Sequence, residues 1–177
     1  MTAMFRSIAR QFRKFRKDQR GAVLVEMTIV APVMLVLCAG VFEFGNLIHD
    51  KLLMQAGLSD AARYGARCNT KLYTDAGLAI NCATVASNIA LYGNVGGTGT
   101  ARVPGWNTQS PNVTVTIGTN CKDAVVSGVT QYRSVTPQVC VVRADGTYAY
   151  SGVGLLSLVG IGTITLTGYH EERLIRF

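Results

Sequence analysis

An uncharged apolar run near the N-terminus constrains this chain more than any other feature. No charged side chain occurs between Met27 and Phe42, and apolar residues continue beyond this run as far as Ile48. About 20 apolar residues are enough for a helix to cross the hydrocarbon core of a bilayer. The sequence from Ala22 to about Phe42 is therefore predicted to be a membrane-spanning helix.

The residues before this run carry most of the net charge. The chain has 17 Lys and Arg against 10 Asp and Glu, and seven of the basic residues lie within residues 1–20, with a single acid. The remaining chain is nearly neutral, so the charge indicates a basic leader and no nucleic-acid partner is expected. Basic residues flanking a span favour the cytoplasmic side. We therefore expect a cytoplasmic N-terminus and a C-terminal part across the membrane.

Three export signals begin in this way. A secretory signal has a shorter apolar region of about 7–15 residues, and a lipoprotein signal at Cys38 would follow the bulky Leu37. A prepilin leader is cut on the cytoplasmic side, before the apolar run. Here the basic stretch ends at Gly21, Ala22 follows, and Glu26 is the fifth residue after the glycine. This arrangement favours the prepilin leader, with cleavage between Gly21 and Ala22.

Glu26 is a carboxylate at the start of an apolar helix, which is costly unless it is paired or reaches water. Cleavage after Gly21 would free an α-amine at Ala22, and Glu26 of one subunit could neutralise that amine on its neighbour. Alternatively, Glu26 needs no partner because it lies near the membrane interface and its carboxylate contacts water. Glu43, near the other interface, is expected to be solvated or paired along the helix.

The helix is predicted to continue past the membrane to Arg67. Pro32 should loosen it locally, since proline lacks a backbone donor. Gly57, Ala61 and Gly65 form a stripe of small residues that permits close approach of another element. We expect this stripe to pack on the chain's own domain, with a neighbouring subunit as the alternative.

The sequence from Arg20 to Arg67 resembles the TadE-like pseudopilins of tight-adherence (Tad/Flp) type IV pilus systems. The resemblance rests on Gly21 and Glu26 in a G-x4-E spacing, on the apolar run around Pro32, and on the sequences EFG at 43–45 and AARYGAR at 61–67. A weaker similarity lies at 154–175. TadF-like proteins share the same start, so the branch stays open.

The resemblance implies cleavage by a prepilin peptidase and a minor role in pilus assembly, at initiation or at the tip. It also implies other pilins as partners, both the major Flp pilin and a TadF-like minor pilin. The implied location is the inner membrane, with a single span and a periplasmic head that could enter a pilus. The expected domains are a leader at 1–21 that is removed, a pilin-like helix at 22–67 and a head at 68–177.

Two other functions fit the sequence. An uncleaved, single-pass periplasmic binding module would keep Met1 and would not require Glu26. A pseudopilin of a type II-like secretion machine would share the processing and differ only in its partners.

Four cysteines follow the membrane segment, whereas Cys38 lies within it and is expected to act as a small apolar residue. An even number of cysteines outside the cytoplasm indicates disulfides. Three pairings are possible, and short loops favour Cys68 with Cys82 and Cys121 with Cys140. No metal-ligand spacing occurs among them, so we expect neither a metal nor another cofactor.

The head is predicted to be α+β, with a small antiparallel sheet of about three to five strands packed on helices. A helix is expected over 76–92, capped by Thr74 and Asp75, and a glycine-rich loop over 93–107. The apolar face of this helix is expected to be Leu78, Cys82, Val85, Ile89 and Tyr92, which alternate four and three apart. Alternating residues predict strands at 113–117, 134–143 and 162–169. Asp145 and Gly146 predict a hairpin turn before a strand at 147–150. The apolar residues 153–161 form either a buried connection or an exposed docking patch.

Catalytic motifs are sparse. The two histidines are His49, just past the span, and His170, which is expected on a surface strand beside Glu171 and Glu172. Neither a nucleophile elbow nor a phosphate-binding loop is present. The chain is therefore predicted to be no enzyme.

Overall fold

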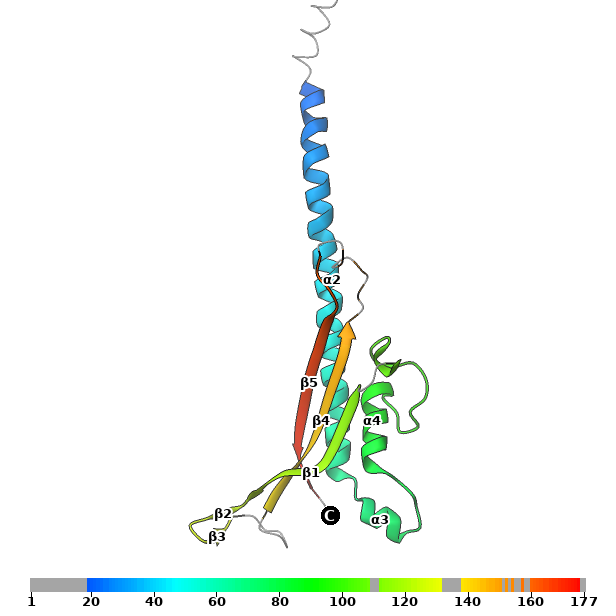
Figure 1. Ribbon diagram of the computed structural model, residues 1–177, viewed down its shortest axis with the longest axis vertical. Coiled ribbons are helices and arrows are strands. Elements are labelled where there is room, and N and C mark those ends of the chain that lie inside the picture. The colour runs from blue at the N-terminus through cyan, green and yellow to red at the C-terminus, as the bar shows by residue number, and fades with distance from the viewer. Residues whose placement is uncertain are drawn as a thin grey trace, which may run out of the picture. The chain divides into compact units, whose positions relative to one another are not determined.

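The computed structural model describes residues 19–108, 112–131, 138–150, 152, 154, 157 and 160–175. The chain divides into two compact units, Met1–Phe44 and Gly45–Phe177, which are considered separately. Helix α2 (Gln19–Arg67) contributes to both. The second unit, called the head below, combines the end of α2 with two helices, a three-stranded sheet and a small hairpin (Figure 1). The predicted α+β class is confirmed.

The sheet of the head has the order β1-β4-β5, and both pairings are antiparallel. Its strands are β1 (Val113–Asp123), β4 (Gln138–Tyr150) and β5 (Ile164–Arg173). Side chains alternate along β4 between buried and half-buried, as expected where one face of a sheet packs on helices. The strands predicted at 113–117 and 162–169 lie largely within β1 and β5. Of the strand predicted at 134–143, residues 138–143 belong to β4 and residues 134–137 lie outside the described residues. Most of residues 153–161 also lie outside them.

The core lies between this sheet and the helices. It is formed by buried residues of α2, of α4, of the sheet and of the loop before β1. These residues are Met54, Leu58, Ala61, Ala62, Ala66, Ala86, Ala90, Leu91, Val103, Trp106, Val115, Val142, Ala144, Tyr148, Tyr150 and Leu166. Small alanines predominate on the helices. They let the backbones approach closely, and the larger side chains of the sheet and the loop fill the remaining space.

The predicted turn at Asp145 and Gly146 is wrong. Strand β4 continues through both residues, and Gly146 pairs with Val113 on one side and Gly168 on the other. A Cβ at Gly146 would lie 3.0 Å from both terminal carbons of Leu58 and 3.2 Å from Cζ2 of Trp106. Gly146 is therefore required because α2 packs closely on the sheet at this point. It lies in a regular strand and forms no turn.

The helix predicted over 76–92 is shorter than expected, and a separate short helix precedes it. Helix α3 (Thr70–Asp75) ends where the cap was expected, and α4 (Cys82–Tyr92) begins later. The cap of α4 is Asn81, whose Oδ1 accepts hydrogen bonds from the amides of Ala83 (3.0 Å) and Thr84 (3.1 Å). An asparagine in this position satisfies backbone donors that have no partner within the helix. It therefore determines where α4 starts.

The apolar face expected from spacing, Leu78, Cys82, Val85, Ile89 and Tyr92, is only partly the buried face. Cys82 is buried at 1% exposed, but Leu78 is 51% exposed and lies before α4, and Val85, Ile89 and Tyr92 are only half-buried. The residues that contact the core most closely are Ala86 and Ala90, both fully buried. Small side chains face inward because α2 and α4 approach each other closely.

The glycine-rich loop after α4 ends in a 3-10 turn, η1 (Trp106–Thr108). Trp106 is fully buried, and its Nε1 donates to the carbonyls of Thr147 (2.9 Å) and Asn112 (3.3 Å). The indole thus fills the core and satisfies two backbone acceptors at once. It fixes the loop against the sheet.

The far end of β1 leaves the sheet. Its register against β4 shifts after Ile117 and again after Thr119, and Asn120 has a positive φ of 50°. The chain continues into a hairpin of β2 (Val125–Val126) and β3 (Val129–Thr130). Ser127 and Gly128 form its turn, with φ values of 53° and 79°, the combination that a type I′ turn requires. Figure 1 shows this hairpin projecting from the end of β1.

Candidate functional site

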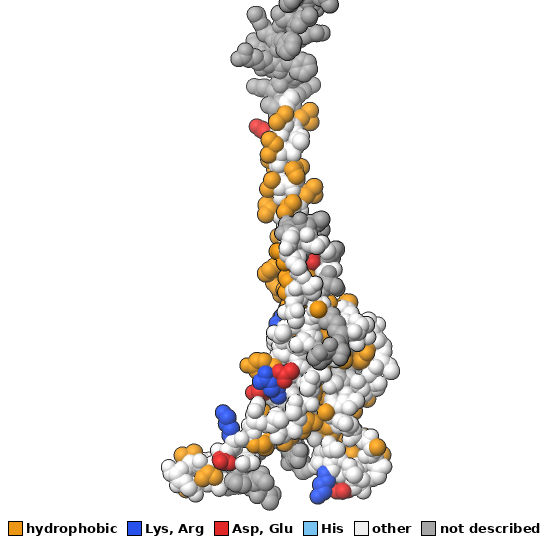
Figure 2. All heavy atoms as spheres, in the orientation of Figure 1, with side chains coloured by type: hydrophobic (Ala, Val, Ile, Leu, Met, Phe, Trp, Pro, Cys, Tyr) orange, Lys and Arg blue, Asp and Glu red, His pale blue; other side chains and the backbone are white. Residues whose placement is uncertain are grey.

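The N-terminal part of α2 is an apolar helix whose side chains are exposed. Between Val23 and Phe44 the large apolar side chains are 50–73% exposed, and Figure 2 shows them around the helix. Of the described residues, this helix is the one long and apolar enough to cross a membrane. Exposed apolar surface of this extent requires a cover, such as lipid or neighbouring helices. A single membrane span is consistent with this geometry.

Glu26 is the single acid on this apolar surface before Glu43, and its side chain is exposed. The described residues give its carboxylate no ion-pair or hydrogen-bond partner. The nearby hydroxyl of Thr28 does not serve Glu26, because it donates to the carbonyl of Leu24 at 2.7 Å. Any partner for Glu26 must therefore come from outside this part of the chain.

Other predicted features of the helix are also placed. Gly21 and Ala22 lie within α2, and a Cβ added at Gly21 would meet no atom within 4 Å. Pro32 lies inside the helix, and Cys38 is a free, exposed thiol. Glu43 was expected to be solvated or paired along the helix; it is only 1% exposed, so the solvated alternative is wrong, and pairing along the helix stays a prediction. A buried carboxylate is stable only with a partner, and Glu43 does take part in an interaction.

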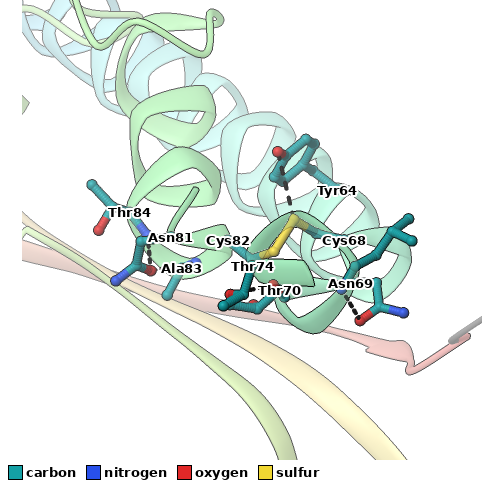
Figure 3. The surroundings of a disulfide bond; sticks show 10 residues. Tyr64, Cys68, Asn69, Thr70, Thr74, Asn81, Cys82, Ala83 and Thr84 are labelled. Carbon is teal, nitrogen blue, oxygen red and sulfur yellow. Dashed lines mark hydrogen bonds between the residues drawn. A yellow bond between two sulfur atoms is a disulfide. The ribbon is translucent and has the colours of Figure 1, made fainter. Parts of the chain in front are cut away.

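One disulfide joins Cys68, directly after α2, to Cys82, the first residue of α4. Both cysteines are buried, at 6% and 1% exposed. The Tyr64 hydroxyl donates to the Cys68 sulfur at 3.6 Å, and Asn69 caps α3 beside it (Figure 3). The bond closes a loop that contains α3 and holds α4 against α2.

The second disulfide joins Cys121 of β1 to Cys140 of β4. It lies next to the Lys122–Val139 pair, within the second register shift of β1, between Thr119 and Lys122. The bond therefore holds the two strands together where the ladder is irregular and where the hairpin begins. The two disulfides are the pairs that short loops favour.

Polar contacts link α2 to β5 on the surface. The ammonium of Lys51 donates to the carbonyl of Thr167, and Arg63 pairs with Glu172 at 3.4 Å. His170 lies on β5, half-buried, with its Nε2 3.3 Å from Glu172 Oε1. Within the part of the chain that the structure describes, no three His, Cys, Asp or Glu side chains group to hold a metal.

The outer face of the sheet carries an ionic cluster centred on Arg143. Its guanidinium contacts Asp145 at 2.9 Å and Glu171 at 3.0 Å and lies 4.1 Å above the ring of Tyr169. Hydrogen bonds to Asp145 and then to Glu171 raise the pKa of Arg143 further above its usual range. The cluster is a cross-strand contact that ties β4 to β5.

Sequence reasoning missed one concave feature of the head. A pocket brings His49 and Asp50 of α2 together with Arg102 from the loop and with Tyr148 and Tyr150 of β4. These residues are distant in sequence and share no motif. The only signal was a pair of ionisable residues directly after the apolar span.

The comparisons with known proteins concern the N-terminal part of the chain. Residues 21–63 match the family model described as TadE-like protein. Neither the curated proteins nor the solved structures provide a match. The weaker similarity at 154–175 lies outside the matched region. The match agrees with the resemblance found in the sequence: over residues 21–63 the chain is similar to TadE-like proteins.

Proposed function

We propose that this protein is a minor pilin of a Tad/Flp pilus, cleaved between Gly21 and Ala22 by a prepilin peptidase. The apolar part of α2 then holds it in the inner membrane, with the N-terminus cytoplasmic and the head periplasmic. From there it joins other pilins, the major Flp pilin and a TadF-like minor pilin, in the initiation or tip complex. The observation that carries the proposal is the TadE-like match, which starts at Gly21 and covers the exposed apolar helix.

In this proposal Glu26 forms the ion pair that aligns neighbouring subunits. Removal of residues 1–21 leaves a positively charged amine on Ala22, at the start of a helix that is otherwise apolar to Phe42. Both charges are costly in lipid when alone, and each stabilises the charged form of the other when they are close. Pairing Glu26 with the amine of a neighbouring subunit would fix the relative height of the two helices.

The first experiment measures the N-terminal mass of the protein from cells with and without the prepilin peptidase. A chain that starts at Ala22 only when the peptidase is present is the expected result. Gly21→Leu should block this cleavage. Gly40→Leu is the matched control, because a Cβ at either glycine meets no atom within 4 Å. An intact Met1 in both strains would refute processing and favour an uncleaved membrane-anchored module.

The second experiment replaces the carboxylate. Glu26→Gln should insert and be cleaved normally, because its shape is kept, but it should enter pili poorly because the charge is lost. Asp75→Asn, an exposed aspartate on α3, is the control for a general effect of losing one negative charge. Pili are counted in cells that carry only the variant protein. Normal piliation with Glu26→Gln would refute the pairing.

A further inference from the structure

The two disulfides of the head differ in how far solvent reaches them. Cys68 and Cys82 are buried, at 6% and 1% exposed, whereas Cys121 is exposed and Cys140 is half-buried. Thiol–disulfide exchange requires a thiolate to reach one of the two sulfur atoms, so access controls its rate. An external thiol can therefore approach the bond at Cys121, whereas the folded head shields the bond at Cys68.

The buried disulfide is also held by the packing around it. Cys82 is the first residue of α4, and this helix carries the fully buried Ala86 and Ala90 into the core. Helices α4 and α2 approach so closely that a Cβ at Gly57 would lie 2.5 Å from the carbonyl oxygen of Ala90. Exposing the Cys68–Cys82 bond to a thiol thus requires α4 to leave the core.

The segment that follows Cys121 has no comparable support. No side chain from Cys121 to Gln131 is buried. This segment includes the β2–β3 hairpin that projects from the end of β1 in Figure 1. Its valines are exposed, at 40% for Val125, 63% for Val126 and 60% for Val129. The core therefore does not hold the hairpin in place.

The links between this segment and β4 are few. Besides the disulfide, the described residues provide two pairs of the ladder, Lys122–Val139 and Asp123–Gln138. The side-chain amide of Gln138 adds an exposed hydrogen bond to Asp123 at 3.0 Å. A ribbon of two exposed strands is at best marginally stable in water. The Cys121–Cys140 bond is therefore the strongest link that keeps the hairpin on the sheet.

The part of the sheet that lies on the core does not depend on this bond. Val115 of β1 is 8% exposed and pairs with Ala144 of β4, which is fully buried. This pair precedes the first register shift, which follows Ile117. Opening of the Cys121–Cys140 bond should consequently release the end of β1 and the hairpin while the core stays folded.

We propose that Cys121–Cys140 is a site of thiol–disulfide exchange with an external dithiol, and that its reduction releases the hairpin. A thiolate of the dithiol bonds to Sγ of Cys121 as the S–S bond breaks, and the electron pair leaves on Sγ of Cys140, which takes up a proton from water. The second thiolate of the dithiol then attacks the reagent's own sulfur in this mixed disulfide and displaces Cys121 as a thiolate, which is protonated in turn. The dithiol is oxidised to a disulfide, and the two cysteines are reduced to thiols.

The bond thereby controls how the exposed valines of the hairpin are presented. In the oxidised protein the hairpin is held at the end of β1, and in the reduced protein it is free to move away from the sheet. The inference goes beyond the proposed function and requires no cleavage at Gly21.

The first test treats the full chain in detergent with dithiothreitol, a dithiol, and quenches samples at successive times with iodoacetamide. Peptide masses then give the reduced fraction of each cysteine. Cys121 and Cys140 are expected to become free at least about tenfold faster than Cys68 and Cys82, because the first pair is open to solvent. The emission of buried Trp106 should stay unchanged while the first pair is reduced. In guanidinium, which unfolds the head, the two pairs should react at the same rate.

The second test identifies the sulfur that is attacked. Glutathione, a monothiol, replaces dithiothreitol, and the mixed disulfide is located by peptide mass after alkylation. The glutathione adduct is expected on Cys121, which is exposed, with the alkyl group on Cys140. An adduct found chiefly on Cys140 would overturn the proposed direction of attack.

The third test measures release of the hairpin by limited digestion with trypsin. Lys122 lies in the loop closed by the exposed disulfide, and Lys71 of α3 is an equally exposed lysine in the loop closed by the buried one. Selective reduction should speed cleavage after Lys122 several-fold and leave cleavage after Lys71 unchanged. The double variant Cys121→Ala/Cys140→Ala should be cleaved after Lys122 at the faster rate without any reductant.

Three results would overturn the proposal. The first is reduction of both pairs at the same rate in the folded protein. The second is a difference between the pairs that persists in guanidinium, since it would then not come from the fold. The third is cleavage after Lys122 that stays unchanged once the Cys121–Cys140 bond is open.

Discussion

Replacing Gly57 by alanine should destabilise the head, although alanine is the better helix former. A Cβ at Gly57 would lie 2.5 Å from the backbone carbonyl oxygen of Ala90 in α4. No side-chain rotation can relieve a clash with a backbone atom, so the two helices must separate. Overpacking of this kind costs up to about 3 kcal/mol. The gain in helix propensity returns about 1 kcal/mol. The expected net loss is about 2 kcal/mol, or roughly 4–10 °C in Tm for a unit of this size.

Gly45→Ala is the matched control on the same helix, since a Cβ at Gly45 meets no atom within 4 Å. Its stability should be unchanged or increased by up to about 1 kcal/mol. Both variants are measured as full chains in detergent by following the fluorescence of Trp106, the single tryptophan of the chain. That residue is fully buried in the head, so its emission reports unfolding of this unit. If Gly57→Ala is as stable as the Gly45→Ala protein, the argument from close helix approach is wrong.

Three further predictions concern the head. Gly146→Ala should lower Tm more than Gly168→Ala. A Cβ at Gly146 would meet the buried side chains of Leu58 and Trp106, whereas a Cβ at Gly168 would meet the flexible ends of Met54 and Gln55. Equal Tm values for the two variants would contradict this. Replacing Cys68 and Cys82 together by alanine should cost about 3 kcal/mol, since the bond spans 14 residues, and an unchanged denaturant midpoint would refute it. Asp50→Asn should stabilise the head at neutral pH. The raised pKa of Asp50 means that the wild-type protein loses stability as pH rises above the ordinary aspartate value of 3.8. The gain should vanish in Tm measurements below that pH, and a gain that persists there would refute the assignment.

The features predicted correctly from sequence are local ones. The apolar helix follows from a continuous run of residues that requires no knowledge of the rest of the chain. The disulfide pairs follow from short separations along the chain, 14 residues for Cys68–Cys82 and 19 for Cys121–Cys140. In both cases the sequence neighbours are also the spatial neighbours.

The features missed depend on contacts between distant segments. The pair Asp145 and Gly146 has the composition of a turn, but packing against Leu58 and Trp106 places it in a strand. The apolar face of α4 was predicted from the spacing of its larger apolar residues, whereas close approach to Gly57 places alanines on the buried face. The actual hairpin turn at Ser127 and Gly128 lacks the Asn-Gly or Asp-Gly sequence that usually marks it.

The pocket illustrates the same limit for the candidate site. His49 and Asp50 are adjacent in sequence, but Arg102 and Tyr148 reach them only through the fold. Glu26, by contrast, could be singled out from sequence because its setting is a single helix.

The order of the cysteines has a consequence for how the head matures. Both disulfides join consecutive cysteines, Cys68 with Cys82 and Cys121 with Cys140. In a chain that is exported from its N-terminal side, the first pair is complete 39 residues before Cys121 emerges. Oxidation in order of arrival therefore yields the native bonds directly, and the head should reach its final connectivity without a disulfide isomerase.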